Sequence, residues 1–594
     1  MSQRLVRIGG ASGAWGDSPR AIPQLLGAEV DYLMMDYLAE VTMSLLARAR
    51  MKDPAAGFPP DFVSYLREPL PEIARRKIRI VSNAGGVNPA GCKAALEAIC
   101  AEAGVSLRIA AVEGDDLMPL AEKLRAEGIR EDLTGLPLPP RLLTANAYLG
   151  ALPISRALDD GADIVITGRC ADSALALGIL MHEFKWTAEE YDRLAAGSLV
   201  GHLLECGPQS TGGLYTDWEK VPDWHNIGYP IAECRADGSF VVTKPDGTGG
   251  LVTPGTVAEQ ALYEIGDPAA YILPDVIADF SQVHLTQEAP DRVLVTGARG
   301  RPPTDLYKVS ATYQDGYRAV ATVSIVGIDA ARKARRTGEA LLARARMTFK
   351  ERGIEDFTST HIEELGADAA YGRDTSLSPS REVLLRLVVV HRDRKAIELL
   401  AREVGSIGIS FAPGTTGIYS GRPKATPLIR LCTFFVKKAE LPRPTVMLDA
   451  NTITVDIPAG HPLVSAVERP AAVAEEIAAG PSVEVPLIRL ALARSGDKGN
   501  LSNIAIIARD PSFVPVLRRE VTSERIAAHF RDLIGGPVHR YEAPGLGAFN
   551  FVLEDALGGG GMASSRIDPQ GKAFGQMALE MKVQVPSALL GKID

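Results

Sequence analysis

One segment near the C-terminal end, RSGDKGN at 494–500, gathers two cations, a hydroxyl and a carboxylate in a loop that contains two glycines. It follows an apolar run typical of a buried strand, so its polar groups lie where that strand ends. Arg494 and Lys498 can present positive charge, while Ser495 and Asp497 can orient them or a substrate hydroxyl. The segment suits a carboxylate or phosphate ligand, and it would equally suit an interdomain salt-bridge loop.

Polar residues and glycines also follow six short apolar runs in the first 185 residues, at the point where each run ends. In a mostly parallel sheet the carboxyl ends of the strands form the ligand-binding edge. We therefore expect these residues to converge on one pocket for an acidic organic ligand. The expected catalytic residues are Asp36, Glu40, Asn83, Glu113, Asn146 and Asp172, and the expected substrate-binding residues are Gly9, Gly10, Ser12, Gly13, Gly85, Gly86, Asn88 and Arg169.

Three of these strand ends allow a more detailed interpretation. GGASGAWGDS at 9–18 lacks the GxGxxG spacing of dinucleotide-binding loops, but its N–H groups could receive an oxyanion, or its glycines could serve packing alone. In NAGGVNP at 83–89, two amides and two glycines favour close approach of a ligand to the backbone. Arg169 suits an anionic ligand, and equally an ion pair with Asp172 or Asp36.

Another glycine-containing segment, SFAPGTTGIYSGRP at 410–423, repeats the combination of small polar residues with one arginine. Thr415 and Arg422 are its candidate ligands for an anionic group. We therefore expect this segment to contribute to substrate binding.

The stretch 200–275 is polar and rich in glycine, as expected of a lid, a binding loop or a domain connection. His202 and Glu205 share one helical face there, which suits proton transfer. With Cys206 and Asp217 they could also hold a divalent metal, although the spacing fixes no third ligand. The metal site is therefore only a possibility, with its ligands unknown.

The order of the predicted elements must position these groups. Apolar runs alternate with helical patterns at first, which predicts an α/β domain with a mostly parallel sheet. This domain spans 1–280 and is followed by an α+β domain of split βαβ type at 281–455, a Pro- and Ala-rich linker at 456–483, and a small α+β domain at 484–594. The predicted strands of the first domain are 5–10, 30–36, 77–85, 106–114, 142–148 and 163–169.

Length and charge narrow the class of partner. With 594 residues the chain needs several hydrophobic cores, and its net charge of −9 includes no basic block, which argues against nucleic acid or an anionic membrane as partner. We find no signal-like or membrane-spanning apolar stretch, so we expect a cytoplasmic protein, and we expect it to form a homo-oligomer. Six scattered cysteines without a CxxC pair indicate neither disulfides nor structural zinc.

Six segments together resemble the acyclic terpene utilization family AtuA, whose core was catalogued as a domain of unknown function and is followed by an AtuA-like C-terminal domain. The segments, in chain order, are IGGASGAWGDS, MDYLAE, SNAGGVNPAGC, ITGRCADSA, ECGPQSTGG and ARSGDKGN. The resemblance covers nearly the whole chain. It implies degradation of branched acids as coenzyme A thioesters, with coenzyme A as part of the substrate and no other certain cofactor.

The resemblance further implies a carbon–carbon lyase that acts on a 3-hydroxy-3-substituted glutaryl-CoA. An acyl-CoA hydratase or dehydratase, or a non-catalytic acyl-CoA-binding subunit of a biotin-dependent acyl-CoA carboxylase, are the alternatives. Retro-aldol cleavage needs a base for the 3-hydroxyl proton and donors that stabilise the leaving enolate. The candidate bases are Asp36, Glu40, Glu113 and Asp172, and the candidate donors are Asn83, Asn146 and the N–H groups of the glycine loops.

Overall fold

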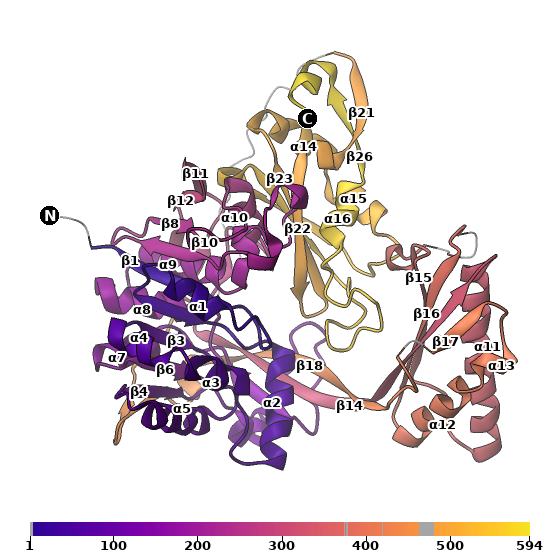
Figure 1. The fold of residues 1–594 in the computed structure, drawn as a ribbon, viewed down its shortest axis with the longest axis horizontal. Coiled ribbons are helices and arrows are strands. Elements are labelled where there is room, and N and C mark those ends of the chain that lie inside the picture. Colours follow the sequence, from indigo (N-terminus) through magenta and orange to yellow (C-terminus); the bar gives the residue numbers. More distant parts are fainter. Residues whose placement is uncertain (1–3, 374, 376–377, 419, 463–479, 594) are drawn as a thin grey trace.

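The computed structural model describes residues 4–373, 375, 378–418, 420–462 and 480–593. Figure 1 shows an N-terminal α/β domain, a middle domain at the far end of a long strand, and a C-terminal domain beside both. The predicted fold class is confirmed, because a large sheet with a parallel centre occupies the first domain and smaller sheets occupy the others. Among the described helices, none has both the length and the apolar character needed to cross a membrane.

The N-terminal domain is built on an eleven-stranded sheet. Its five central strands are parallel, in the order β1-β2-β3-β6-β4, and antiparallel strands extend both edges. The central strands are β1 (Val6–Ser12), β2 (Tyr32–Met35), β3 (Arg79–Ser82), β6 (Ile164–Thr167) and β4 (Ile109–Glu113). Beyond β1 lie β7 (Ile231–Cys234), β8 (Phe240–Thr243), β12 (Arg292–Thr296) and β11 (His284–Ala289), and beyond β4 lie β19 (Thr445–Leu448) and β20 (Asn451–Thr454). Segments of the predicted 281–455 domain thus complete the first sheet.

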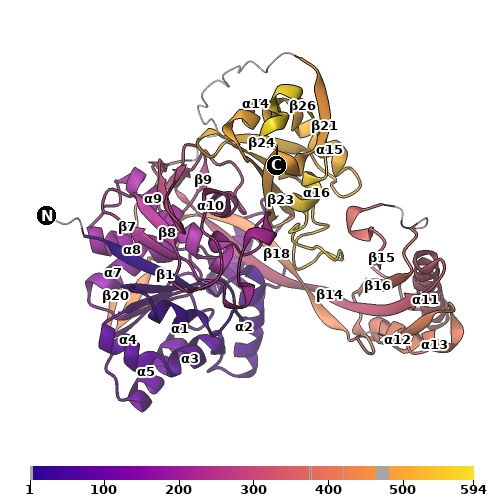
Figure 2. The ribbon, with the colours of Figure 1, turned by 45° about the horizontal axis from the view of Figure 1, so that its top comes forward.

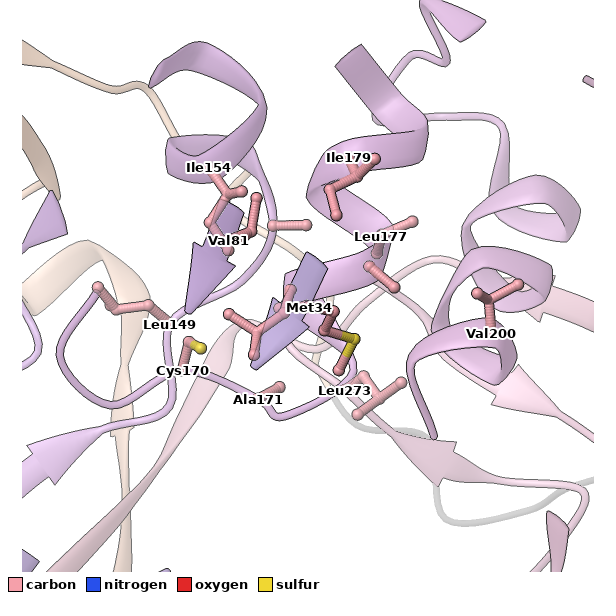
Figure 3. Packing of buried hydrophobic residues seen from close by; sticks show 14 of the residues in the cluster. Met34, Val81, Leu149, Ile154, Cys170, Ala171, Leu177, Ile179, Val200 and Leu273 are labelled. Carbon is pink, nitrogen blue, oxygen red and sulfur yellow. The ribbon is translucent and has the colours of Figure 1, made fainter. Parts of the chain in front are cut away.

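Helices cover both faces of this sheet, because successive strand residues point to opposite sides. Leu33 and Ile80 pack with one set of helices, whereas Met34 and Val81 pack with the other. The first set is α1 (Ala21–Leu26), α3 (Pro60–Arg67), α4 (Leu70–Arg76) and α5 (Pro89–Ala103), and the second is α7 (Leu152–Asp159), α8 (Ala174–Phe184) and α9 (Tyr191–Leu204). Figure 3 shows Met34 and Val81 within the second core.

The sequence run 142–148 forms a strand outside the parallel sheet. This strand, β5 (Thr144–Ala147), pairs antiparallel with β14 (Leu306–Val326). A short apolar run does not specify its pairing partner, so the alternation of elements placed it with the wrong neighbours. Its residue Asn146 nevertheless reaches the end of β4, since its side chain bonds to Asp115.

Strand β14 is 21 residues long and joins two domains. Its first half pairs with β5 and β18 (Thr426–Lys437), and its second half pairs with β16 (Glu382–His391) and β17 (Thr415–Ile418). In the middle domain β15 (Ser359–Leu365) extends the sheet beyond β16, and α11 (Ala330–Arg352) and α12 (Arg394–Val404) pack against it. Figure 1 shows β14 running from one domain into the other.

The C-terminal domain has a four-stranded antiparallel sheet, in the order β22-β23-β25-β24, beside the pair β21–β26. Its strands are β21 (Ser482–Pro486), β22 (Ala491–Lys498), β23 (Leu501–Ala508), β24 (Val538–Ala543), β25 (Ala548–Leu553) and β26 (Lys582–Pro586), and its helices are α14 (Val514–Glu520), α15 (Ser523–His529) and α16 (Phe574–Leu579). Figure 2 shows this domain seated on the N-terminal domain. Most of the predicted linker, from 463 to 479, lies outside the described residues.

Polar contacts hold the C-terminal domain on the N-terminal domain. Arg509 donates two hydrogen bonds to the Asp217 carboxylate, at 2.7 and 2.6 Å, and Asn503 donates to the Leu262 carbonyl at 2.8 Å. Asp217 lies 13 residues after the end of α9, within the polar stretch 200–275. This stretch is therefore a docking surface for the last domain.

We expect Asp217→Asn to weaken this docking by about 1–3 kcal/mol at pH 7, because a charged bidentate contact is lost. The hydrogen bonds from Arg509 lower the pKa of Asp217, so the carboxylate stabilises the folded state above its unfolded value of about 4 and loses that effect as pH falls through its depressed pKa. Urea unfolding followed by circular dichroism should therefore separate the variant from the parent at pH 7, and the difference should narrow as pH falls below about 4. A difference that persists unchanged at pH 3 would contradict the assignment.

Candidate functional site

The ends of three parallel strands contact one another directly. Asn83, after β3, donates from Nδ2 to Asp36 Oδ1 at 2.6 Å and accepts the Tyr37 N–H at 2.8 Å. Ser12, at the end of β1, donates from Oγ to the Asp36 carbonyl at 2.9 Å. The structure thus brings Ser12, Asp36 and Asn83 together, as the parallel topology requires.

Arg169 lies at the end of β6 and is only 3% exposed. Its guanidinium donates to Asp172 Oδ1 at 2.6 Å, to the Leu38 carbonyl at 2.7 Å and to the Tyr148 hydroxyl at 3.2 Å. Burial and the Asp172 charge raise the pKa of Asp36 well above its usual value, while Arg169 opposes the rise. Arg169 therefore acts as the central cation between two carboxylates.

A second buried carboxylate sits behind this arginine. Asp115 accepts the Arg169 N–H at 2.8 Å and the Asn146 side-chain amide at 2.8 Å. Burial raises the pKa of Asp115 to about 7. Glu113, two residues earlier, ends β4 beside Thr445, and burial raises its pKa as well. Asn146 therefore orients Asp115.

The end of α9 and the C-terminal domain add further titratable groups near these strand ends. His202 Nδ1 lies 2.9 Å from Glu205 Oε1, and burial lowers the pKa of His202 to about 4, which keeps the ring neutral at pH 7. Burial and the charge of Asp172 raise the pKa of Glu205 well above its usual value, and Lys498 opposes the rise. We call Asp36, Arg169, Asp172, Glu205 and Lys498 the strand-end cluster.

A cavity of about 750 Å³ adjoins this cluster. Its walls are the glycine loop 13–17, residues between 206 and 227, and parts of the C-terminal domain that include 493–495 and Lys572. Glu205 belongs to the cluster and Cys206 lines the cavity, so the two regions meet at adjacent residues. Most of the wall is apolar, which suits a hydrocarbon chain with a few polar groups.

Two tryptophans lie in the cavity wall with unusual exposure. Trp218 and Trp224 are 56% and 57% exposed, and their ring centroids are 5.9 Å apart in an edge-to-face arrangement. Burial and the charges of Glu205 and Glu264 raise the pKa of the Cys206 thiol well above its usual value. The cavity therefore offers an aromatic region and a protonated thiol.

Of the predicted binding residues, Gly13, Arg494 and Ser495 line this cavity. A Cβ at Gly13 would lie 2.6 Å from the backbone of Cys206 and Gly207, so glycine permits the close approach of two cavity walls. Asp497 lies 3.5 Å from the Lys572 ammonium. The RSGDKGN segment was predicted as a loop after a strand, but its first five residues belong to β22 and only residues 499–500 form the turn. It borders both the cavity and the strand-end cluster.

Other predicted residues have packing contacts instead. Gly9, Gly10 and Gly85 touch neighbouring elements so closely that a Cβ would lie within 3.0 Å of them, and the same holds for Gly86. Asn88 caps α5, since its Oδ1 accepts the Gly91 N–H at 3.1 Å while its amide donates to a neighbouring loop. These residues shape the strand ends, and a direct role in binding stays a prediction.

Three predicted residues lie elsewhere or beyond description. Glu40 begins α2 (Glu40–Lys52), and its side chain is outside the described residues. Thr415 begins β17, where its hydroxyl donates to the Ala412 carbonyl at 2.8 Å, and Arg422 is exposed in the same domain. Both residues of the middle domain are absent from the described cavity wall.

The possible divalent metal gains no ligand set here. Within the described part of the chain, no group of three His, Cys, Asp or Glu side chains is placed to hold one ion. His202 Nε2 is buried without a hydrogen-bond partner among the described residues, but its other nitrogen contacts only Glu205.

Comparison with known families agrees with the resemblance seen in the sequence. The model of the acyclic terpene utilisation family protein AtuA matches residues 6–447, and the model of the AtuA ferredoxin-like domain matches residues 485–584. Searches among curated proteins and among solved structures gave no match. Since the first match alone covers well over half of its length, the chain belongs to the acyclic terpene utilisation family AtuA.

Proposed function

We propose that the protein is an enzyme of branched acid degradation that cleaves a 3-hydroxy-3-substituted glutaryl-CoA by a retro-aldol reaction. Family membership connects the chain with acyclic terpene utilisation. The observation that carries the proposal is the position of the strand-end cluster, with its carboxylates and two cations, directly beside a largely apolar cavity. Such a pair of regions suits a substrate with a polar reacting end and a branched apolar substituent.

In this reaction a base removes the 3-hydroxyl proton, and the bond between C2 and C3 breaks as the C3–oxygen bond becomes a carbonyl. The bonding electrons pass to C2 as an enolate, which then takes up a proton. The products are a 3-oxo compound and a two-carbon acyl product, and the step consumes neither water nor a redox partner. It therefore needs only one base, one acid and a cation near the enolate oxygen.

The strand-end cluster contains groups for each role. Asp172 is 30% exposed at its side chain and ion-paired with Arg169, and we assign it as the base. Glu205, whose pKa burial raises, holds a proton and is assigned as the acid that protonates the enolate. Lys498 supplies positive charge for the enolate oxygen. Asp36 and Asn83 are buried behind these groups and position them.

The test is turnover by the purified full chain. 3-Hydroxy-3-substituted glutaryl-CoA thioesters with methyl and longer branched substituents are incubated alone with the protein, and the products are identified by mass spectrometry. We expect a 3-oxo product, faster with the longer substituents, and a loss of about 10²–10⁴ in kcat for Asp172→Asn. Asp192→Asn, which changes an exposed carboxylate paired with Arg299, is the matched control.

Other outcomes would replace the proposal. A product that differs from the substrate by one water would indicate a hydratase or dehydratase. Tight binding without turnover, combined with capture of an acyl-CoA carboxylase, would indicate the non-catalytic subunit.

A further inference from the structure

We propose that Arg494 and Lys572, which both contact Tyr263, form a binding site for the free carboxylate of the substrate in the cavity wall. This inference rests on the proposed function for the identity of the substrate, and it adds the residues that select it. Arg494 lies in the strand β22 and Lys572 lies just before α16, so the C-terminal domain supplies both cations.

Arg494 is a buried cation that forms no ion pair among the described residues, although the charges of Glu259 and Glu264 act on it and oppose the lowering of its pKa by burial. It is 7% exposed, lines the cavity, and donates to the neutral side chain of Gln209. Its guanidinium lies 4.4 Å from the centroid of the Tyr263 ring, and no carboxylate among the described residues forms an ion pair with it. Burying a charge without a counter-ion is costly, and an anion in the cavity would remove that cost.

Lys572 is the second donor of this site. Its Nζ contacts the Tyr263 hydroxyl, lies 4.5 Å from the ring centroid, and is 3.0 Å from Glu264 Oε1. Burial lowers the pKa of Lys572 to about 8, and the charge of Cys206 opposes this shift. Glu264 already compensates part of the charge of Lys572. Lys572 therefore contributes to the site mainly as a hydrogen-bond donor.

Ser495 fixes the spacing of the two cations. Its hydroxyl donates to the Lys572 carbonyl at 3.1 Å and accepts the Gly575 N–H at 2.8 Å. The backbone that carries Arg494 is thereby tied to the backbone that carries Lys572. Ser495 is a positioning residue in this arrangement, which explains why a hydroxyl directly follows the arginine.

A carboxylate fits this site better than the phosphates of coenzyme A. One buried guanidinium without an ion pair among the described residues matches a single negative charge, whereas a diphosphate would bring further charges into a wall that includes Trp15, Leu214 and Trp218. The carboxylate end of the substrate would therefore bind at Arg494, with its apolar substituent along the tryptophans. Carboxylate and phosphate are both oxyanions, so the experiment must distinguish binding of one from binding of the other.

The test uses N-acetylcysteamine thioesters, which have no phosphate. Calorimetry at pH 7 compares the half-thioester of 3-hydroxy-3-methylglutaric acid with its methyl ester and with coenzyme A alone, on the full chain. We expect the free acid to bind at least 10-fold more tightly than the ester. Arg494→Gln should abolish this preference, Lys572→Met should reduce it several-fold, and Arg494→Lys should restore part of it.

The controls separate this inference from folding and from catalysis. Lys220→Met removes an exposed cation near the cavity and should leave the preference unchanged. If Arg494→Gln does not fold, Lys572→Met and Arg494→Lys still test the site. Equal binding of acid and ester by the parent protein would overturn the inference. It would also be overturned if Arg494→Gln lost coenzyme A binding but kept the preference for the acid. Since binding is measured without turnover, a preference for the acid would support the site even if no lyase activity is found.

Discussion

Replacing Arg169 with leucine is expected to lower the free energy of unfolding by about 3–5 kcal/mol, because it leaves buried carboxylates without their cation. The guanidinium is bonded to Asp172, to the Leu38 carbonyl and to Tyr148, and almost none of it reaches solvent. Leucine fills part of the volume but satisfies none of these groups. Urea unfolding at pH 8, followed by circular dichroism, measures this change in the free energy of unfolding.

The matched control for this change is Arg299→Leu. Arg299 also pairs with an aspartate, Asp192, but both side chains are more than half exposed. An exposed pair contributes about 0–1 kcal/mol, so this variant should unfold nearly like the parent. Similar small effects of both substitutions would show that Arg169 is not the central cation of the strand ends.

Replacing Asp115 with asparagine should change how stability depends on pH. Burial raises the pKa of Asp115 to about 7, against about 4 in the unfolded chain. The folded protein therefore holds a proton that the unfolded chain releases, and this group makes the protein less stable as pH rises from 4 to 7. A shift of three pH units corresponds to a loss on the order of 4 kcal/mol, complete above pH 7.

Asparagine removes this ionisation while its carbonyl can still accept from Asn146 and the Arg169 N–H. The free energy of unfolding of Asp115→Asn, relative to the parent, should therefore rise with pH between 4 and 7 and then level off. Asp192→Asn is the control, since the Asp192 carboxylate is exposed and pairs with Arg299. Parallel curves for parent and Asp115→Asn would contradict a raised pKa.

The sequence predicted the parallel centre of the first sheet and the meeting of its strand ends. Ser12, Asp36, Asn83 and Arg169 could be placed because the carboxyl ends of parallel strands share one edge. The charged and hydroxyl side chains of RSGDKGN also pointed to it as part of a candidate site, and Arg494 and Ser495 do line the cavity. Local patterns were sufficient for Asp36, Asn83 and Arg169 because each comes just after its own strand, whereas the predicted loop at 494–500 was wrong, since residues 494–498 form the end of β22 itself.

Contacts between distant segments were beyond the reach of these patterns. Lys572 reaches Tyr263 across 309 residues, and Arg494 reaches Gln209 across 285, yet neither pairing leaves a periodic signal. Trp218 and Trp224 stand in an irregular loop, where hydrophobic periodicity does not indicate which side chains will face a cavity. The pairing of β5 with β14 was missed for the same reason, since strand partners depend on the whole fold.

The long strand β14 has a consequence for how the molecule can be divided. Its residues form hydrogen bonds with strands of both the N-terminal and the middle domain. The segment 306–326 is therefore not a linker at which the two domains could be separated. Excision of the middle domain would leave β5 and β18 with unpaired edges. A chimera that exchanges the middle domain between related proteins should therefore exchange β14 and β18 together, as one antiparallel pair.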